Sequence, residues 1–92
     1  SIIKGKGRPY RNPFFTIKVF PTALAHSRFG VAVGKKASAT AVGRNKIKRM
    51  IFQAIGLVMG RWPVADYLVI VGAPLKINQK EINERFISQS FH

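Results

Sequence analysis

One stretch of the chain combines the repeat of an amphipathic helix with a dense run of positive charge, and this combination limits what the chain can form. Between Ile47 and Val58 the apolar residues recur three and four positions apart, which is typical of a helix with one buried face. Ser38 or Thr40 can cap the start of this helix, and Gly60 marks its end. The helix therefore needs a second layer of structure to cover its apolar face.

The other side of this helix is cationic. Lys35 and Lys36 precede it, and residues 44–49 supply four more cations with Asn45 among them. No acidic residue lies between positions 26 and 62, so these cations have no oppositely charged neighbour in the sequence. Arginine binds phosphate oxygens with paired hydrogen bonds, lysine acts as a point charge, and asparagine can bond a base edge or a 2′-hydroxyl. The pattern favours a phosphate-bearing partner; the alternative is a solvated helix face.

Three further stretches predict strands. Residues 14–20 and 28–34 are rich in β-branched and aromatic side chains, and the short turn between them favours an antiparallel pair. Residues 67–71 are apolar without interruption, which is typical of a central strand buried on both faces. The glycines and prolines of residues 1–13 favour an extended basic segment over a helix.

A second helix is expected over residues 78–91, where Asn78 can serve as N-cap with Glu81 three residues later. The order of strands, helix, strand and helix predicts an α+β fold, a small α/β sandwich with one mixed sheet of about four strands and helices packed on it. At this length the whole of residues 1–92 is expected to form a single domain.

The net charge limits the classes of partner that the chain can bind. There are 16 Lys and Arg residues against 3 Asp and Glu residues, which gives a net charge of +13. Such self-repulsion opposes a compact state unless a polyanion relieves it, so nucleic acid or an anionic membrane surface is the expected partner. No apolar run approaches the roughly 18–20 residues that a membrane span needs. The absence of cysteine excludes a disulfide framework and a thiol nucleophile.

The chain is poor in groups for catalysis. A protein-only metal nuclease needs several carboxylates around divalent ions, and the sequence offers only Asp66, Glu81 and Glu84. His26 falls in a predicted turn and His92 at the end of the sequence, which favours surface histidines over an acid–base pair. We therefore predict no catalytic residue and no metal ligand.

The aromatic pair Phe14-Phe15 is ambiguous between core and binding roles. Neighbours on a strand point to opposite faces, so one ring is expected in the core. The other is expected on an open sheet face beside Lys18, where it can stack on unpaired bases.

Two neighbouring motifs resemble the bacterial ribonuclease P protein subunit. Residues 28–36 read R-F-G-V-A-V-G-K-K and residues 41–49 read A-V-G-R-N-K-I-K-R, where that family has approximately R-x-G-x-x-V-x-K-K and then G-N-A-V-x-R-N-R-x-K-R. Residues 66–71, 78–82 and 7–15 also agree, so the resemblance covers nearly the whole chain. The chain departs from the pattern at Lys46, which replaces an arginine, and it lacks the usual Gly-Asn and most of the family's N-terminal helix.

The resemblance implies a left-handed βαβ crossover and an accessory role in the endonucleolytic 5′ maturation of tRNA in the cytoplasm. In that family the RNA subunit performs the hydrolysis with Mg²⁺ held mainly by RNA, and the protein binds this RNA and the 5′ leader of precursor tRNA. By motif position the expected RNA-binding residues are Lys35, Lys36, Arg44, Asn45, Lys46, Lys48 and Arg49. The expected leader-cleft residues are Phe14, Phe15 and Lys18, and Arg44, Asn45 and Lys48 are expected to line this cleft as well.

Three other functions fit parts of the sequence. The chain can be a non-catalytic ribosomal or chaperone-like RNA-binding protein, which needs the same charge but no precursor tRNA. It can be a cationic membrane-surface protein, although the strands argue against this. It can also be a protein-only ribonuclease that uses His26. The sequence does not indicate an oligomeric state.

Overall fold

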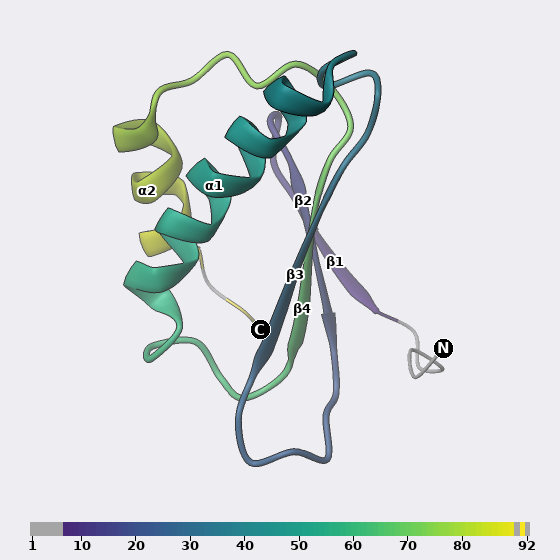
Figure 1. The fold of residues 1–92 in the computed structure, drawn as a ribbon. Helices are drawn as coiled ribbons and strands as arrows, with labels where there is room; N and C mark the ends of the chain where they lie inside the picture. Colours follow the sequence, from purple (N-terminus) through teal and green to yellow (C-terminus); the bar gives the residue numbers. More distant parts are fainter. Residues whose placement is uncertain (1–6, 90, 92) are drawn as a thin grey trace.

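The computed structural model describes residues 7–89 and 91, which form a four-stranded sheet with two helices on one of its faces (Figure 1). The elements in chain order are β1 (Arg8–Arg11), β2 (Thr16–Phe20), β3 (Arg28–Val33), α1 (Ala41–Val58), β4 (Asp66–Val71) and α2 (Gln79–Ile87). The predicted α+β class is confirmed. Among the described residues, neither helix is long and apolar enough to cross a membrane.

The strands lie in the order β1-β2-β4-β3, so β4 separates β2 from β3. β4 pairs antiparallel with β2, from Thr16↔Ile70 to Phe20↔Asp66, and parallel with β3. The predicted antiparallel pair of β2 and β3 is therefore wrong. β4, the most apolar strand, lies inside the sheet with both of its edges hydrogen-bonded, and residues 21–27 carry the chain past it.

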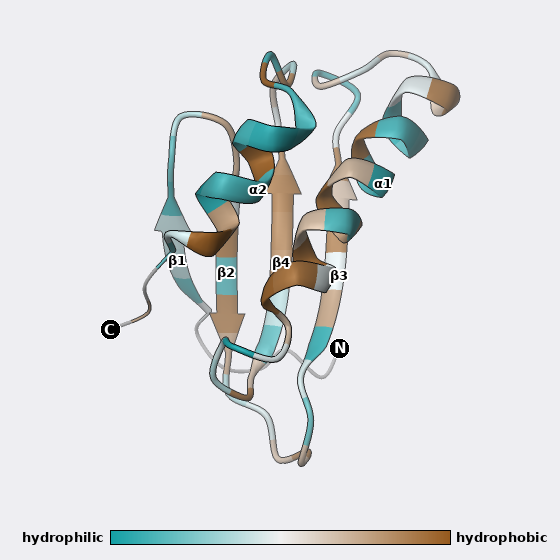
Figure 2. Cartoon of the chain, turned by 90° about the vertical axis from the view of Figure 1, so that its left-hand side faces the viewer, coloured by the Kyte–Doolittle hydropathy of each residue, from teal (hydrophilic) through white to brown (hydrophobic). Residues whose placement is uncertain are grey.

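The connection from β3 through α1 to β4 is a left-handed crossover. In Figure 2 the helices face the viewer, β3 lies to the right of β4, and both strands run upward. The chain leaves β3 at the top, descends through α1 in front of the sheet, and enters β4 on the left. This hand is rare for parallel strands, and the resemblance to the ribonuclease P protein anticipated it.

The core lies between the sheet and the helices, and β4 is buried on one face only. Tyr67, Val69 and Val71 point toward the helices and are buried, whereas Leu68 and Ile70 point away and are half-exposed. The prediction of a strand buried on both faces is wrong because both described helices lie on the same side of the sheet. We call the other side the open face.

Aromatic rings close one end of the core. The Trp62 ring stacks on Phe86 with centroids 5.5 Å apart and meets Phe91 edge-on at 4.7 Å. The second helix is shorter than predicted, since Ser88 is its C-cap and the chain beyond it returns Phe91 to this cluster. Trp62 is buried and belongs to the core.

Candidate nucleic-acid interface

The sequence of α1 sets which of its residues face outward. Thr40 is the N-cap, and its hydroxyl oxygen accepts a hydrogen bond from the Gly43 backbone N–H at 3.0 Å. The buried positions of the helix, all within the predicted apolar stripe, are Ile51, Ala54, Ile55 and Val58. With this face fixed against the sheet, the polar residues of the first three turns must point to the sides or to solvent.

Four polar residues form what we call the α1 arc: Arg44, Asn45, Lys48 and Arg49. At 3.6 residues per turn they fall within about 140° of the helix circumference. Arg44 and Lys48 lie beside the buried face and are half-buried, whereas Asn45 and Arg49 are exposed. Lys46 is also exposed but lies about 160° from Lys48, on the other side of the helix. The fold therefore gathers four of the five predicted α1 residues on one surface.

Arg44 also links the helix to the loop before it. Its Nη1 donates a hydrogen bond to the Ser38 carbonyl oxygen at 3.0 Å, which uses one of the five guanidinium N–H groups. Gly43 lets this loop approach closely, because a methyl group there would overlap Ser38 Oγ and lie 3.0 Å from Thr40 Oγ1. The first turn of α1 thus holds the loop that carries Lys35 and Lys36.

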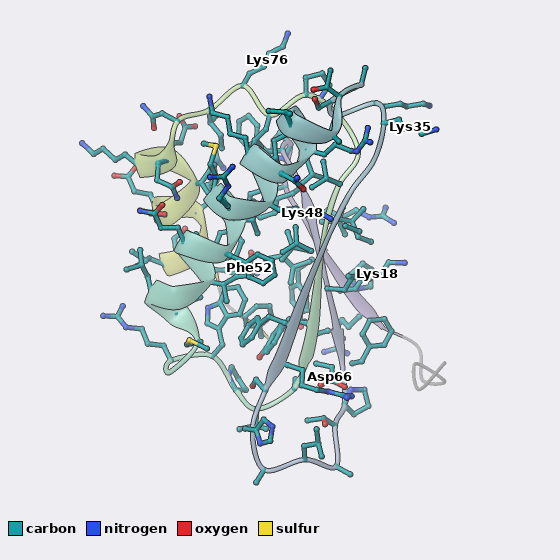
Figure 3. All side chains as sticks on the ribbon, in the orientation of Figure 1. Lys18, Lys35, Lys48, Phe52, Asp66 and Lys76 are labelled. Atoms are coloured by element: carbon teal, nitrogen blue, oxygen red, sulfur yellow. The ribbon has the colours of Figure 1, made fainter. Side chains whose placement is uncertain are left out.

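Lysines from two separate loops lie at one end of the molecule. Lys35 and Lys36 follow β3 and are exposed, and Lys76 lies in the exposed loop between β4 and α2. Figure 3 shows Lys35 and Lys76 at the end where α1 begins. Lys76 was not among the predicted residues. Its loop lies beside that of Lys35 because β3 and β4 are parallel, so both strands end at the same edge of the sheet.

The open face carries cations around an apolar centre. The register places Lys18 opposite Leu68 and Pro9, and Arg11 opposite Thr16, which directs Lys18 and Arg11 to this face. Lys18 therefore lies where it was predicted, with Leu68 beside it. Arg11, which the sequence analysis did not single out, joins it.

Neither phenylalanine of the Phe14-Phe15 pair reaches the open face. Phe15 is 4% exposed and packs on Phe86, and the guanidinium group of Arg85 lies 4.7 Å above the Phe14 ring. The expectation of an open-face ring beside Lys18 is wrong for a local reason. The Asn12 side-chain oxygen accepts from the backbone N–H groups of both phenylalanines, so these residues form a turn before β2 and do not alternate as a strand.

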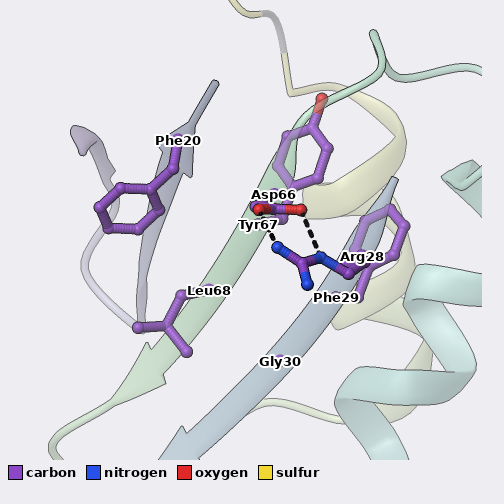
Figure 4. Close-up of a pocket in the computed structure, with 7 residues that line it drawn as sticks. All are labelled: Phe20, Arg28, Phe29, Gly30, Asp66, Tyr67 and Leu68. Atoms are coloured by element: carbon purple, nitrogen blue, oxygen red, sulfur yellow. Dashed lines mark hydrogen bonds and ion pairs between the residues drawn. The ribbon is translucent and has the colours of Figure 1, made fainter. Parts of the chain in front are cut away.

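The only ion pair on the described open face joins Arg28 and Asp66 (Figure 4). Arg28 Nη2 lies 2.7 Å from Asp66 Oδ2, and Nε donates to Oδ1 at 3.0 Å. This hydrogen-bonded guanidinium lowers the pKa of Asp66 below its usual value. A pocket of about 190 Å³ adjoins the pair, and its lining residues are Phe20, Arg28, Phe29, Gly30, Asp66, Tyr67 and Leu68.

The described residues do not fit a magnesium site. No three or more His, Asp or Glu side chains come together among them. Asp66 is bound to Arg28 on the open face, while Glu81 pairs with Arg85 on α2 at 3.6 Å. His26 lies exposed in the loop between β2 and β3.

Comparison with known proteins assigns the chain to a family. The family model described as Ribonuclease P matches residues 1–91. The chain belongs to the ribonuclease P protein family. The resemblance carried by the motifs at 28–36 and 41–49 is thereby confirmed.

Individual relatives and solved structures support this family assignment. The ribonuclease P protein component of Aliivibrio fischeri is 40% identical over 75 residues, which are 82% of this chain and 62% of that protein. The chain thus spans about 62% of the length of this relative. The Staphylococcus aureus RNase P protein superposes with a TM-score of 0.75 at 30% identity over 85% of this chain and 72% of its own. The Thermotoga maritima RNase P protein, at 24% identity, shares the fold with a TM-score of 0.81 over 94% of this chain and 83% of its own.

Proposed function

We propose that the chain acts as the protein subunit of ribonuclease P. In this role it binds the catalytic RNA subunit and the 5′ leader of precursor tRNA, and so supports the endonucleolytic 5′ maturation of tRNA. Family membership and the fold support the assignment. Relatives of the chain are ribonuclease P protein components.

The observation that carries the proposal is the α1 arc. Its residues project from a helix that has no acidic residue, so phosphate groups are the natural counter-charges. Arg44 keeps guanidinium N–H groups for phosphate beyond the one given to Ser38, and Asn45 offers both a donor and an acceptor for a ribose or base edge. Lys35, Lys36 and Lys76 extend this surface around the start of the helix.

The open face is the surface that we assign to the leader. Lys18 and Arg11 supply positive charge for a single strand, and Leu68 and Ile70 between the flanking strands offer apolar contact to bases. Phe14 and Phe15 take no part in this assignment, since both lie on the helix side. The surface and the α1 arc lie on opposite sides of the sheet, so one protein can hold two RNA segments (Figure 1).

In this proposal the RNA subunit, and not the protein, performs the cleavage. The described residues offer no carboxylate cluster, so Mg²⁺ would be held by RNA and the protein would neutralise phosphate charge around it. Localisation in the cytoplasm, where tRNA precursors are processed in bacteria, follows from the same assignment.

Reconstitution tests the proposal. The chain is added to the ribonuclease P RNA of the same organism at low Mg²⁺, and cleavage of precursor tRNA is measured. Stimulation is expected, with Lys48→Ala and Arg49→Ala weaker than wild type and the exposed α2 variant Lys80→Ala equal to it. Binding without stimulation would instead assign the chain to general RNA binding. Cleavage by the protein alone, lost in His26→Ala, would assign it to the protein-only ribonucleases.

A further inference from the structure

Phe52 places an exposed aromatic ring next to the α1 arc. Its side chain is 46% exposed and lies four residues after Lys48 and three after Arg49, so the three side chains are neighbours on the helix surface. Around the helix axis Phe52 falls between those two cations. Figure 3 shows its ring on the side of α1 next to β3. The cationic surface therefore continues into an apolar, flat one.

The position of Phe52 in the fold explains its exposure. β3 is an edge strand of the sheet, and α1 packs over it. A side chain on this flank of α1 projects past the edge, where no further described strand covers it. An exposed ring forgoes the free energy of burial, so a partner that covers Phe52 would recover it.

Open space lies beside the ring. Gly56 follows one turn later on the same flank, and a Cβ atom there would meet nothing within 4 Å. Side chains on a helix tilt toward its N-terminus, so the ring leans toward Lys48 and leaves the side above Gly56 clear. A flat group can lie against the ring while an attached anion reaches the cations.

The charge of the chain indicates which kind of molecule carries this flat group. The chain carries +13, and α1 has no acidic residue, so a second copy of the chain or another basic protein would be repelled. An unpaired nucleotide joins a flat base to a phosphate, and in a duplex the base faces are already stacked. We propose that Phe52 stacks on an unpaired base of the RNA whose phosphates Lys48 and Arg49 bind. The inference rests on the proposed function and adds a contact that does not depend on charge.

The test uses two probes of equal length: an oligoadenylate of about 12 nucleotides with a central 2-aminopurine, and an RNA duplex of about 12 base pairs. The variants are Phe52→Leu, which removes the aromatic face, and Phe52→Tyr, which keeps it. Leu57→Ala is the matched control, because Leu57 is 49% exposed on the same helix about 140° away. We expect Phe52→Leu to weaken oligoadenylate binding about five-fold or more and to abolish the 2-aminopurine signal change. The salt dependence of binding and the duplex affinity should not change.

Phe52→Tyr and Leu57→Ala should match wild type. A Phe52→Leu variant that behaves like Leu57→Ala overturns the inference, as does an equal loss for the duplex. A loss of the same size for poly-L-glutamate would point to an acidic protein and also overturns it. Lys48→Ala, tested in parallel, separates this result from the proposed function: an unchanged salt dependence in that variant removes the α1 arc from the interface, whatever Phe52→Leu does.

Discussion

Single residues of the α1 arc contribute to RNA binding in different ways. Arg44 binds the Ser38 carbonyl and so maintains the loop before the helix, besides presenting charge. Lys48 lies one turn further, on the same flank, and no described acidic residue lies on α1 to neutralise it. Its removal therefore isolates the electrostatic contribution.

Lys48→Ala should lower the affinity for ribonuclease P RNA and reduce its dependence on salt. One lost phosphate contact lowers the slope of log affinity against log salt by roughly 0.7–0.9. Fluorescence anisotropy over a series of salt concentrations measures this slope. Lys80→Ala removes the same charge from the exposed side of α2 and should leave the slope unchanged. Equal slopes for both variants would contradict the assignment of Lys48.

Asp66 gives the fold a dependence on acid pH. Arg28 lowers the pKa of Asp66 in the folded state below the value of 3.8 that applies to the free side chain. The ionised pair therefore stabilises the fold above about pH 4, and this contribution is lost as the pH falls through the lowered pKa. Asp66→Asn should be less stable than wild type at pH 7 and should lose less stability on acidification.

The measurement is the urea midpoint at several pH values, followed by the fluorescence of Trp62, which is the only tryptophan and is buried against Phe86. Glu84→Gln, at an exposed position of α2, serves as the control for loss of a carboxylate. Parallel pH profiles of wild type and Asp66→Asn would show that the ion pair contributes nothing to stability.

At the scale of elements, local periodicity predicted α1 well and β4 only in part. The stripe from Ile47 to Val58 contains every buried position of the helix, because a helix against a sheet buries the residues that repeat every three or four positions. The apolar run of β4 gave no indication that Leu68 and Ile70 would face outward. Whether one or both faces of a strand are covered depends on where the two helices pack. The sequence of β4 does not determine the positions of these helices.

The start of β2 also shows that a local sequence pattern does not fully determine which side chains are buried. Alternation predicted that one ring of the Phe14-Phe15 pair would lie on the open face beside Lys18, but side chains alternate only where the backbone is extended. The side chain of Asn12 turns the chain until Thr16, so the alternation begins two residues later. The dipeptide Asn12-Pro13 is itself typical of a turn, so the sequence contains a signal against an extended strand at Phe14 and Phe15.

The two glycines of α1 should respond in opposite ways to alanine. Gly56 is exposed in the helix interior with open space around it, so Gly56→Ala should stabilise the fold by about 0.5–1 kcal/mol. Gly43→Ala meets Ser38 and Thr40, and it must displace the loop and the N-cap hydrogen bond, a loss of about 0.5–2 kcal/mol. Urea unfolding monitored at Trp62 measures both. Equal stabilisation by both variants would contradict the close contact between Gly43 and the loop.

At the scale of the whole molecule, self-repulsion dominates the electrostatics. The chain has a net charge of +13, and only two ion pairs, Arg28–Asp66 and Arg85–Glu81, occur among the described residues. Salt screens the many repulsive pairs more than it weakens these two attractive ones. We therefore expect the melting temperature to rise between about 50 and 500 mM NaCl in a thermal scan. A fall over this range would show that the ion pairs outweigh the repulsion.

The assembly of the site is the part of the molecule that the sequence predicted least completely. The motifs at 28–36 and 41–49 identified the cations, and the helical repeat placed them beside and opposite the buried face. The contribution of Lys76 depends on the parallel pairing of β3 and β4, which joins segments remote in sequence. Phe52 was not predicted as a surface residue, because its exposure depends on the position of β3 at the edge of the sheet.

Directed cleavage of the RNA tests the central claim, that the α1 arc lies against ribonuclease P RNA. The chain has no cysteine, so Asn45→Cys and Lys80→Cys each provide a single site for a tethered iron chelate. Hydroxyl radicals from residue 45 should cut the RNA at a few discrete places, and those from residue 80 should cut weakly or not at all. Strong cuts from residue 80 with none from residue 45 would contradict the account.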